Sequence, residues 1–282
     1  MERSQSSDPI TMDPEPVDWA HPPAIATVVI NSHGDDMNGI IYISQGAGPH
    51  PTVVMLHGYP GDEKNLDLAQ AIRRTGWNVL FFHYRGAWGS AGTLSVDHAL
   101  EDVVSALDFL DLPASQRDYR VDPGRVALLG HSFGAYVALL SGAQLASVRR
   151  IAVMAPFNMG RWAYDHDQEA WAGMAADLEQ GGHGAIHSDF NAEQFAAMRA
   201  HPELYDPLTQ ADKFDGKSVL VVEGSRDRDA PPAEHCEPLV RQLQERGRAN
   251  LTRGSLDADH VFSSARIALA RLIAGWLADT LA

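Results

Sequence analysis

The pentapeptide Gly130-His131-Ser132-Phe133-Gly134 carries the clearest chemical signal in the chain. The apolar run Val126–Leu129 precedes it and reads as a strand, and Phe133–Leu145 follows with a helical pattern. A G-x-S-x-G sequence between a strand and a helix forms a sharp turn that holds the serine in a strained backbone conformation with Oγ exposed. The two glycines leave room where strand and helix come close. The sequence therefore predicts that Ser132 is a nucleophile, with a helix N-terminus aimed at a developing oxyanion.

A serine hydroxyl is a weak nucleophile, so it needs a base, and the base needs an acid that orients it. In this strand–turn–helix arrangement the acid and then the base follow the serine along the chain. We expect the base to be His260, in the loop just before the last predicted helix. We expect the acid to be Asp227, which follows the predicted strand Ser218–Val222. Asp229 is the alternative acid, although its place ahead of Ala230-Pro231-Pro232 also suits a helix cap.

Two backbone N–H groups are expected to stabilise the oxyanion. One is the amide of Phe133, directly after the nucleophile. The other is the amide of Tyr59, in the tight sequence His57-Gly58-Tyr59-Pro60-Gly61 that follows an early strand. His57 could be read as a catalytic base, but we expect it to make structural hydrogen bonds beneath this loop.

The elements that must position these residues alternate along the chain. Seven apolar runs are predicted strands: Ala24–Ile30, Gly39–Ser44 (after the turn-prone Asn31–Asn38), Thr52–Leu56, Asn78–Phe82, Val126–Leu129, Ile151–Met154 and Ser218–Val222. Runs with helical spacing are Glu63–Thr75, Val96–Leu110, Phe133–Leu145 and about Ser264–Leu281. This alternation predicts an α/β fold with a mostly parallel central sheet and helices on both faces. Ligands bind such sheets at the carboxyl ends of the strands, where the motifs above are found.

The segment 157–214 interrupts the alternation. It is rich in aromatic residues and contains the glycine-rich break Gly181-Gly182-His183-Gly184. We interpret it as an inserted helical lid over the strand ends, whose aromatic residues form an apolar acyl or alcohol pocket. An elaborated crossover without a role in substrate choice is the alternative. Residues 1–23 are expected to be a flexible N-terminal lead-in, and residues 24–282 the catalytic domain.

Composition narrows the class of protein. The 282 residues are 45% hydrophobic, enough for one sizeable core, and the formal net charge of −15 argues against a nucleic acid partner. No apolar run reaches the length of a membrane span, and residues 1–23 lack the apolar h-region of a signal peptide. Cys236 is the single cysteine, so an internal disulfide is excluded and a cytoplasmic location is expected. We read Cys236 as a half-buried packing thiol. The histidines and aspartates lack metal-site spacing, and oligomeric state has no signature in the sequence.

Together these motifs resemble the α/β-hydrolase superfamily, and within it the dienelactone-hydrolase-like and prolyl-oligopeptidase-like hydrolases. The resemblance rests on His57-Gly58-Tyr59-Pro60-Gly61, Tyr84-Arg85-Gly86-Ala87-Trp88-Gly89-Ser90-Ala91-Gly92, Gly130-His131-Ser132-Phe133-Gly134, Gly224-Ser225-Arg226-Asp227 and Asp259-His260. It implies a serine hydrolase without metal or organic cofactor. We expect the protein to differ from secreted lipases in having no signal peptide, and from the large oligopeptidases in having no propeller domain. The expected substrate is a small-molecule carboxylic ester of small to medium size. The alternatives are an amide or peptide substrate, or a non-catalytic binding member of the fold.

Overall fold

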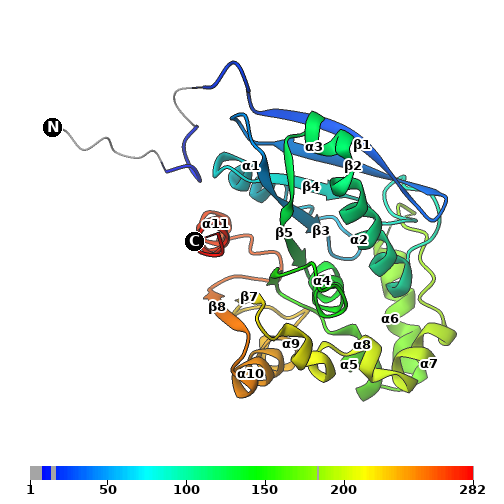
Figure 1. The fold of residues 1–282 in the computed structure, drawn as a ribbon. Coiled ribbons are helices and arrows are strands. Elements are labelled where there is room, and N and C mark those ends of the chain that lie inside the picture. Colours follow the sequence, from blue (N-terminus) through cyan, green and yellow to red (C-terminus); the bar gives the residue numbers. More distant parts are fainter. Residues whose placement is uncertain (1–7, 14–16, 183, 282) are drawn as a thin grey trace.

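A computed structural model describes residues 8–13, 17–182 and 184–281 and contains one eight-stranded sheet (Figure 1). Across the sheet the strands follow the order β1-β2-β4-β3-β5-β6-β7-β8. Their bounds are β1 Ala24–Ser32, β2 Asp35–Ile43, β3 His50–Leu56, β4 Asn78–Phe82, β5 Val121–His131, β6 Arg150–Met154, β7 Ser218–Gly224 and β8 Asn250–Leu256. Neighbouring strands from β4 to β8 pair in parallel, whereas β2 pairs antiparallel with both β1 and β4. The mostly parallel sheet predicted from the alternation is confirmed.

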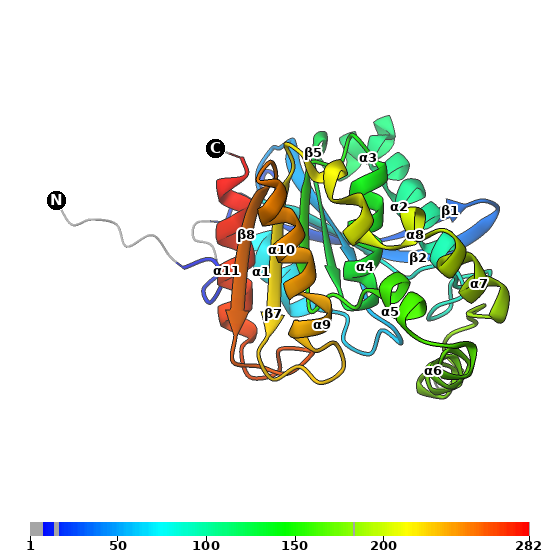
Figure 2. The ribbon, with the colours of Figure 1, turned by 90° about the horizontal axis from the view of Figure 1, so that it is seen from below.

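Helices cover both faces of this sheet, as expected (Figures 1 and 2). Helices α1 (Leu66–Arg74) and α11 (Arg266–Asp279) pack against one face, where they share an apolar core with alternate side chains of the strands. Helices α2 (Val96–Asp111), α4 (Phe133–Gln144) and α10 (Glu237–Arg246) pack against the other. The short helices α3 (Pro113–Asp118) and α9 (Pro232–His235) lie in connections. Because both faces are covered, every residue of β4 is buried and its sequence is a continuous apolar run after Asn78.

Two strand predictions need correction. The turn predicted over Asn31–Asn38 is much shorter, because β2 begins at Asp35 and pairs with β1 as far as Ser32. His33 and Gly34 both have positive φ, as a two-residue type I′ hairpin turn requires. Strand β8 was not predicted at all, since it is a largely polar edge strand in which only Gly254 is buried. An edge strand with one poorly covered face carries little of the apolar pattern by which strands are recognised.

The insertion between β6 and β7 is helical, as predicted, with α6 at its outer edge (Figure 2). It contains α5 Met159–Asp165, α6 Gln168–Gly181, α7 Ala192–Ala200, α8 Pro202–Tyr205 and the 3-10 helix η1 Pro207–Phe214. His183, in the predicted glycine-rich break, lies outside the described residues.

Part of the predicted lead-in contacts the domain. Ile10 is buried beside α1 and α11, and the guanidinium of Arg74 donates hydrogen bonds to the carbonyls of Pro9 and Ile10. Asp8 forms an ion pair with Arg271 of α11. Residues 1–7 and 14–16 lie outside the described part of the chain.

Candidate active site

Ser132 occupies the turn between β5 and α4. Its φ of 56° and ψ of −118° are a strained conformation for a residue with a side chain, at a cost of about 1–3 kcal/mol. The turn is held by its backbone: the Ser132 N–H donates to the Met154 carbonyl on β6 at 3.0 Å, and the Ser132 carbonyl accepts from the first turn of α4. The predicted sharp strand-to-helix turn is therefore present.

The two glycines of the motif are required by close backbone contacts. A Cβ on Gly130 would overlap the carbonyl of Gly134, and a Cβ on Gly134 would overlap the carbonyl of Leu56 at the end of β3. The strand, the turn and the helix therefore pack backbone against backbone, which keeps Ser132 at the carboxyl edge of the sheet.

His260 lies in the loop between β8 and α11, where its ring meets Asp227 from the loop after β7. The His260 Nδ1–H donates to Asp227 Oδ2 at 2.7 Å. The other oxygen of Asp227, Oδ1, accepts the backbone N–H groups of Asp229 and Ala230 at 2.9 and 2.8 Å. Asp227 is buried, whereas Asp229 is exposed. Of the two carboxylates weighed from the sequence, the structure therefore brings Asp227, not Asp229, to His260 Nδ1.

Ser132 and His260 line the same cavity, whose volume is about 230 Å³. Its walls are mainly apolar and come from the loop after β3, the start of α4, the insertion and the loop after β7. They are formed by Tyr59, Ser132, Phe133, Phe157, Met159, Met174, Leu178, Asp229 and His260. No lysine or arginine is among these described lining residues. The site is thus an apolar pocket with a hydroxyl, an imidazole and one exposed carboxylate.

The aromatic residues of the insertion play a different part from the one expected. Trp171 and Phe195 stack on each other at 5.2 Å between ring centroids, inside the insertion's own core. Apart from Phe157, the insertion lines the Ser132 cavity with Met159 and, from α6, with Met174 and Leu178. The sequence analysis missed these residues. The sequence did contain a pattern that could have found them, because Trp171, Met174 and Leu178 follow the three- and four-residue spacing of one helix face.

The amides expected to bind an oxyanion lie beside Ser132. A Cβ built on Gly58 would sit 3.1 Å from Ser132 Cβ, so the His57–Gly61 loop passes directly over the turn. Within the described residues, the N–H groups of Tyr59 and Phe133 donate no hydrogen bond to another group. Both amides are therefore available at the cavity that their side chains line.

His57 lies beneath this loop and not in the cavity. Its Nδ1 donates to the Gly58 carbonyl at 2.7 Å, which is the structural hydrogen bond expected from the sequence. Burial lowers the pKa of His57 to about 4, so the ring is neutral near pH 7. The Gly58 carbonyl and the Tyr59 N–H belong to one peptide plane, so this bond also sets the direction of the Tyr59 N–H.

Comparison with known proteins places the chain in a family. Residues 53–272 match the model of the Alpha/beta hydrolase family. The chain belongs to this family. The resemblance drawn from its motifs is confirmed, and so is the predicted fold class.

Solved structures of similar fold include an esterase of Pyrococcus furiosus, with a TM-score of 0.65, 16% identity and 91% of each chain covered. Est1E from Butyrivibrio proteoclasticus has a TM-score of 0.68 and 16% identity, over 90% of this chain and 98% of Est1E. An uncharacterized protein of Mycobacterium tuberculosis is 34% identical over 119 residues. That match covers 42% of this chain and 41% of the relative, so the chain spans about two fifths of the length of this curated relative.

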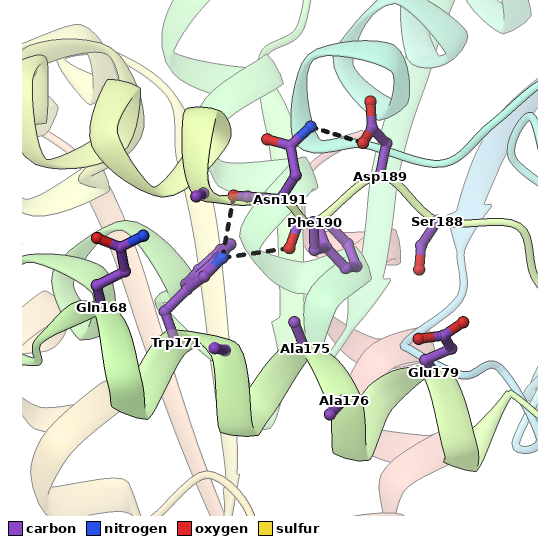
Figure 3. Close-up of a pocket in the computed structure, with 11 residues that line it drawn as sticks. Gln168, Trp171, Ala175, Ala176, Glu179, Ser188, Asp189, Phe190 and Asn191 are labelled. Carbon is purple, nitrogen blue, oxygen red and sulfur yellow. Dashed lines mark hydrogen bonds between the residues drawn. The ribbon is translucent and has the colours of Figure 1, made fainter.

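In this alpha/beta hydrolase a second hollow, of about 370 Å³, lies between α6 and the segment 188–192 (Figure 3). Trp171 lines it, and the indole N–H donates to the carbonyls of Phe190 at 3.2 Å and Asn191 at 3.1 Å. Trp171 is the one residue of α6 that is fully buried. The ring of Phe190 packs against Tyr59 and Phe133, so it separates this hollow from the Ser132 cavity. Trp171 therefore ties α6 to the segment 188–192 of the same insertion.

Cys236 and Arg85 do not line the Ser132 cavity. Cys236 is completely buried, more than expected, and burial raises the pKa of its thiol. Arg85 pairs with the buried Asp102 at 2.6 Å and so anchors its own loop. Within the described chain, no helix is both long and apolar enough to cross a membrane.

Proposed function

We propose that the chain is a serine hydrolase that cleaves carboxylic esters through an acyl-enzyme, with Ser132, His260 and Asp227 as its catalytic triad. The observation that carries this proposal is the 2.7 Å hydrogen bond from His260 Nδ1 to Asp227, at the mouth of an apolar cavity that Ser132 and His260 share. Membership of the alpha/beta hydrolase family supports it, because the family's fold places these positions at one edge of the sheet.

In the proposed mechanism the protonation of His260 follows from its partner. Because Nδ1–H is held by Asp227, Nε2 carries the lone pair that accepts the Ser132 proton. Ser132 Oγ then bonds to the ester carbonyl carbon, and the carbonyl oxygen takes the negative charge. His260 returns the proton to the departing alcohol as the C–O bond breaks. Water, deprotonated by His260 in the same way, releases the acid and restores Ser132.

The N–H groups of Tyr59 and Phe133 are the proposed donors to the oxyanion. Each donor of this kind lowers the barrier by about 3 kcal/mol in serine hydrolases. The strained Ser132 backbone and the helix N-terminus of α4 hold the Phe133 amide in place. The His57 bond to the Gly58 carbonyl holds the Tyr59 amide.

The cavity supports a substrate of small to medium size with an apolar acyl group. Its 230 Å³ exceed the roughly 150 Å³ of a protein cavity that holds benzene. A short acyl chain or a single aromatic ring therefore fits against Met159, Met174 and Leu178. Two proteins of the same fold are consistent with ester chemistry: the Pyrococcus furiosus protein is an esterase, and Est1E has been solved with ferulic acid bound.

The test is hydrolysis of p-nitrophenyl esters of increasing acyl length by the wild type, Ser132→Ala and Ser225→Ala. Ser225 is an exposed serine on the loop that carries Asp227, so its replacement is a matched control. We expect activity that peaks at short to medium chains, is lost in Ser132→Ala and is kept in Ser225→Ala. A fluorophosphonate probe should label the wild type and the control only. If the wild type resisted the probe, the catalytic reading would be wrong. Faster turnover of matched anilides than of esters would assign the triad to amides instead.

A further inference from the structure

Among the described residues that line the mainly apolar Ser132 cavity, Asp229 is the one carboxylate. It lines the Ser132 cavity together with apolar and aromatic side chains, and its side chain is exposed to the opening. Its backbone N–H donates a hydrogen bond to Asp227 Oδ1, but its carboxylate makes no ion pair within the described residues. A charged group at the edge of an apolar binding site weakens ligand binding unless the ligand carries a group of opposite charge.

The described lining of the cavity supplies no cationic side chain that would neutralise this negative charge. No lysine or arginine lines the Ser132 cavity or the adjacent hollow among the described residues. Glu179, at the end of α6, is close enough to Tyr59 for its charge to help raise the pKa of the phenol, after the larger effect of burial. The site therefore favours a cation and disfavours an anion.

Aromatic faces make the cavity suitable for a particular kind of cation. The rings of Tyr59, Phe133 and Phe157 line the cavity that Asp229 borders. Alkylated ammonium groups bind between aromatic rings and a carboxylate, because the rings attract the charge and the methyl groups fill apolar space.

We propose, resting on the serine esterase function above, that Asp229 selects esters whose alcohol part carries an ammonium group. The alcohol part is indicated because one carboxylate oxygen of Asp229 lies within 4.8 Å of a ring nitrogen of His260. His260 donates its proton to the leaving alcohol, so the alcohol leaves on the side of His260 and Asp229. The acyl part then lies against the wall formed by Met174 and Leu178.

The test compares two butyrate esters of the same shape: the trimethylammonioethyl ester and its uncharged 3,3-dimethylbutyl analogue. The measured quantity is the ratio of their kcat/KM values. This ratio cancels any effect of a substitution on Ser132 or His260, since both substrates meet the same machinery. We expect the wild type to prefer the charged ester by about fivefold or more at low salt.

In Asp229→Asn the ratio should fall close to one, whereas Asp177→Asn should keep the wild-type ratio. Asp177 is an exposed residue of α6 outside the cavity lining and carries the same charge change. Added salt should lower the wild-type ratio, and tetramethylammonium should inhibit the wild type more strongly than Asp229→Asn.

Other outcomes overturn the inference. A wild-type ratio at or below one, or the same ratio in Asp229→Asn, would show that Asp229 does not select cations, although cleavage of the neutral ester would leave the esterase function standing. Absence of both ester cleavage and fluorophosphonate labelling of Ser132 would overturn the esterase function itself, and this inference with it.

Discussion

Replacing Asp227 by asparagine tests the proposed triad at its most constrained point. The Asp227 Oδ1 position accepts two backbone N–H groups, from Asp229 and Ala230. An amide NH₂ cannot accept these bonds, so the asparagine oxygen must take the Oδ1 position. The NH₂ group then faces His260 Nδ1, which lies 2.7 Å from the present Oδ2.

This geometry forces a change of tautomer in His260. Opposite an NH₂ donor, Nδ1 must accept, so the ring proton moves to Nε2, the atom proposed to deprotonate Ser132. The same change in serine proteases lowers kcat by about 10⁴. We expect a loss of about 10³ to 10⁴ here, or roughly 4 to 5 kcal/mol of barrier. Folding should be retained, because the side-chain volume and the Oδ1 hydrogen bonds are kept.

The assay is kcat for p-nitrophenyl butyrate, with histidine ¹⁵N shifts as an independent record of the tautomer. Asp257→Asn is the matched control, because Asp257 is an exposed partner of Arg226 on the loop that leads to His260. A folded Asp227→Asn variant with activity within about tenfold of the wild type would refute the assignment of Asp227 as the orienting acid.

Four further predictions concern stability and the attachment of α6. Gly134→Ala should unfold the protein or lower its stability by more than about 3 kcal/mol, because the new methyl group would overlap the Leu56 carbonyl. Gly275→Ala in α11 meets open space and should stabilise by about 0.5–1 kcal/mol in the same denaturation assay. Burial lowers the pKa of His57 from 6.5 to about 4, so only the unfolded chain binds this proton between those values. The stability that neutral His57 contributes is complete above pH 6.5 and is lost as the pH falls toward 4, by about 3 kcal/mol. The free energy of unfolding in urea should therefore differ less between pH 7.5 and pH 5 in His57→Gln than in the wild type. Trp171→Phe removes the N–H that bonds to Phe190 and Asn191 at a cost of about 1 kcal/mol; amide exchange should accelerate in α6 and stay unchanged in α4.

The local sequence was enough to predict the strand-to-helix turn at Ser132. Strands β3, β4, β6 and β7 and the second half of β5 are mainly apolar because both sheet faces are covered, and α1, α2, α4 and α11 show helical periodicity. The predicted strand Asn78–Phe82 matches β4 at both ends. Ser132 could be found in the same way, because glycines, strand and helix are all neighbours of the serine along the chain. Strand β8 could not, since its pairing with β7 depends on the sheet edge and not on its own polar sequence.

The choice between Asp227 and Asp229 depended on the tertiary structure. The two residues are separated by one position on the same loop, so their chemistry and chain order are alike. What distinguishes them is which side chain the folded loop turns toward His260, 33 positions away from Asp227. Likewise, the aromatic residues of the insertion indicated an apolar pocket but not which residues form its walls. The fold buries Trp171 inside the insertion and places Met174 and Leu178 in the lining of the Ser132 cavity. Composition and spacing determine which elements form, because these depend on neighbours in the chain. The direction in which a side chain points and the residues that it contacts depend on packing between distant segments, which only the folded structure decides.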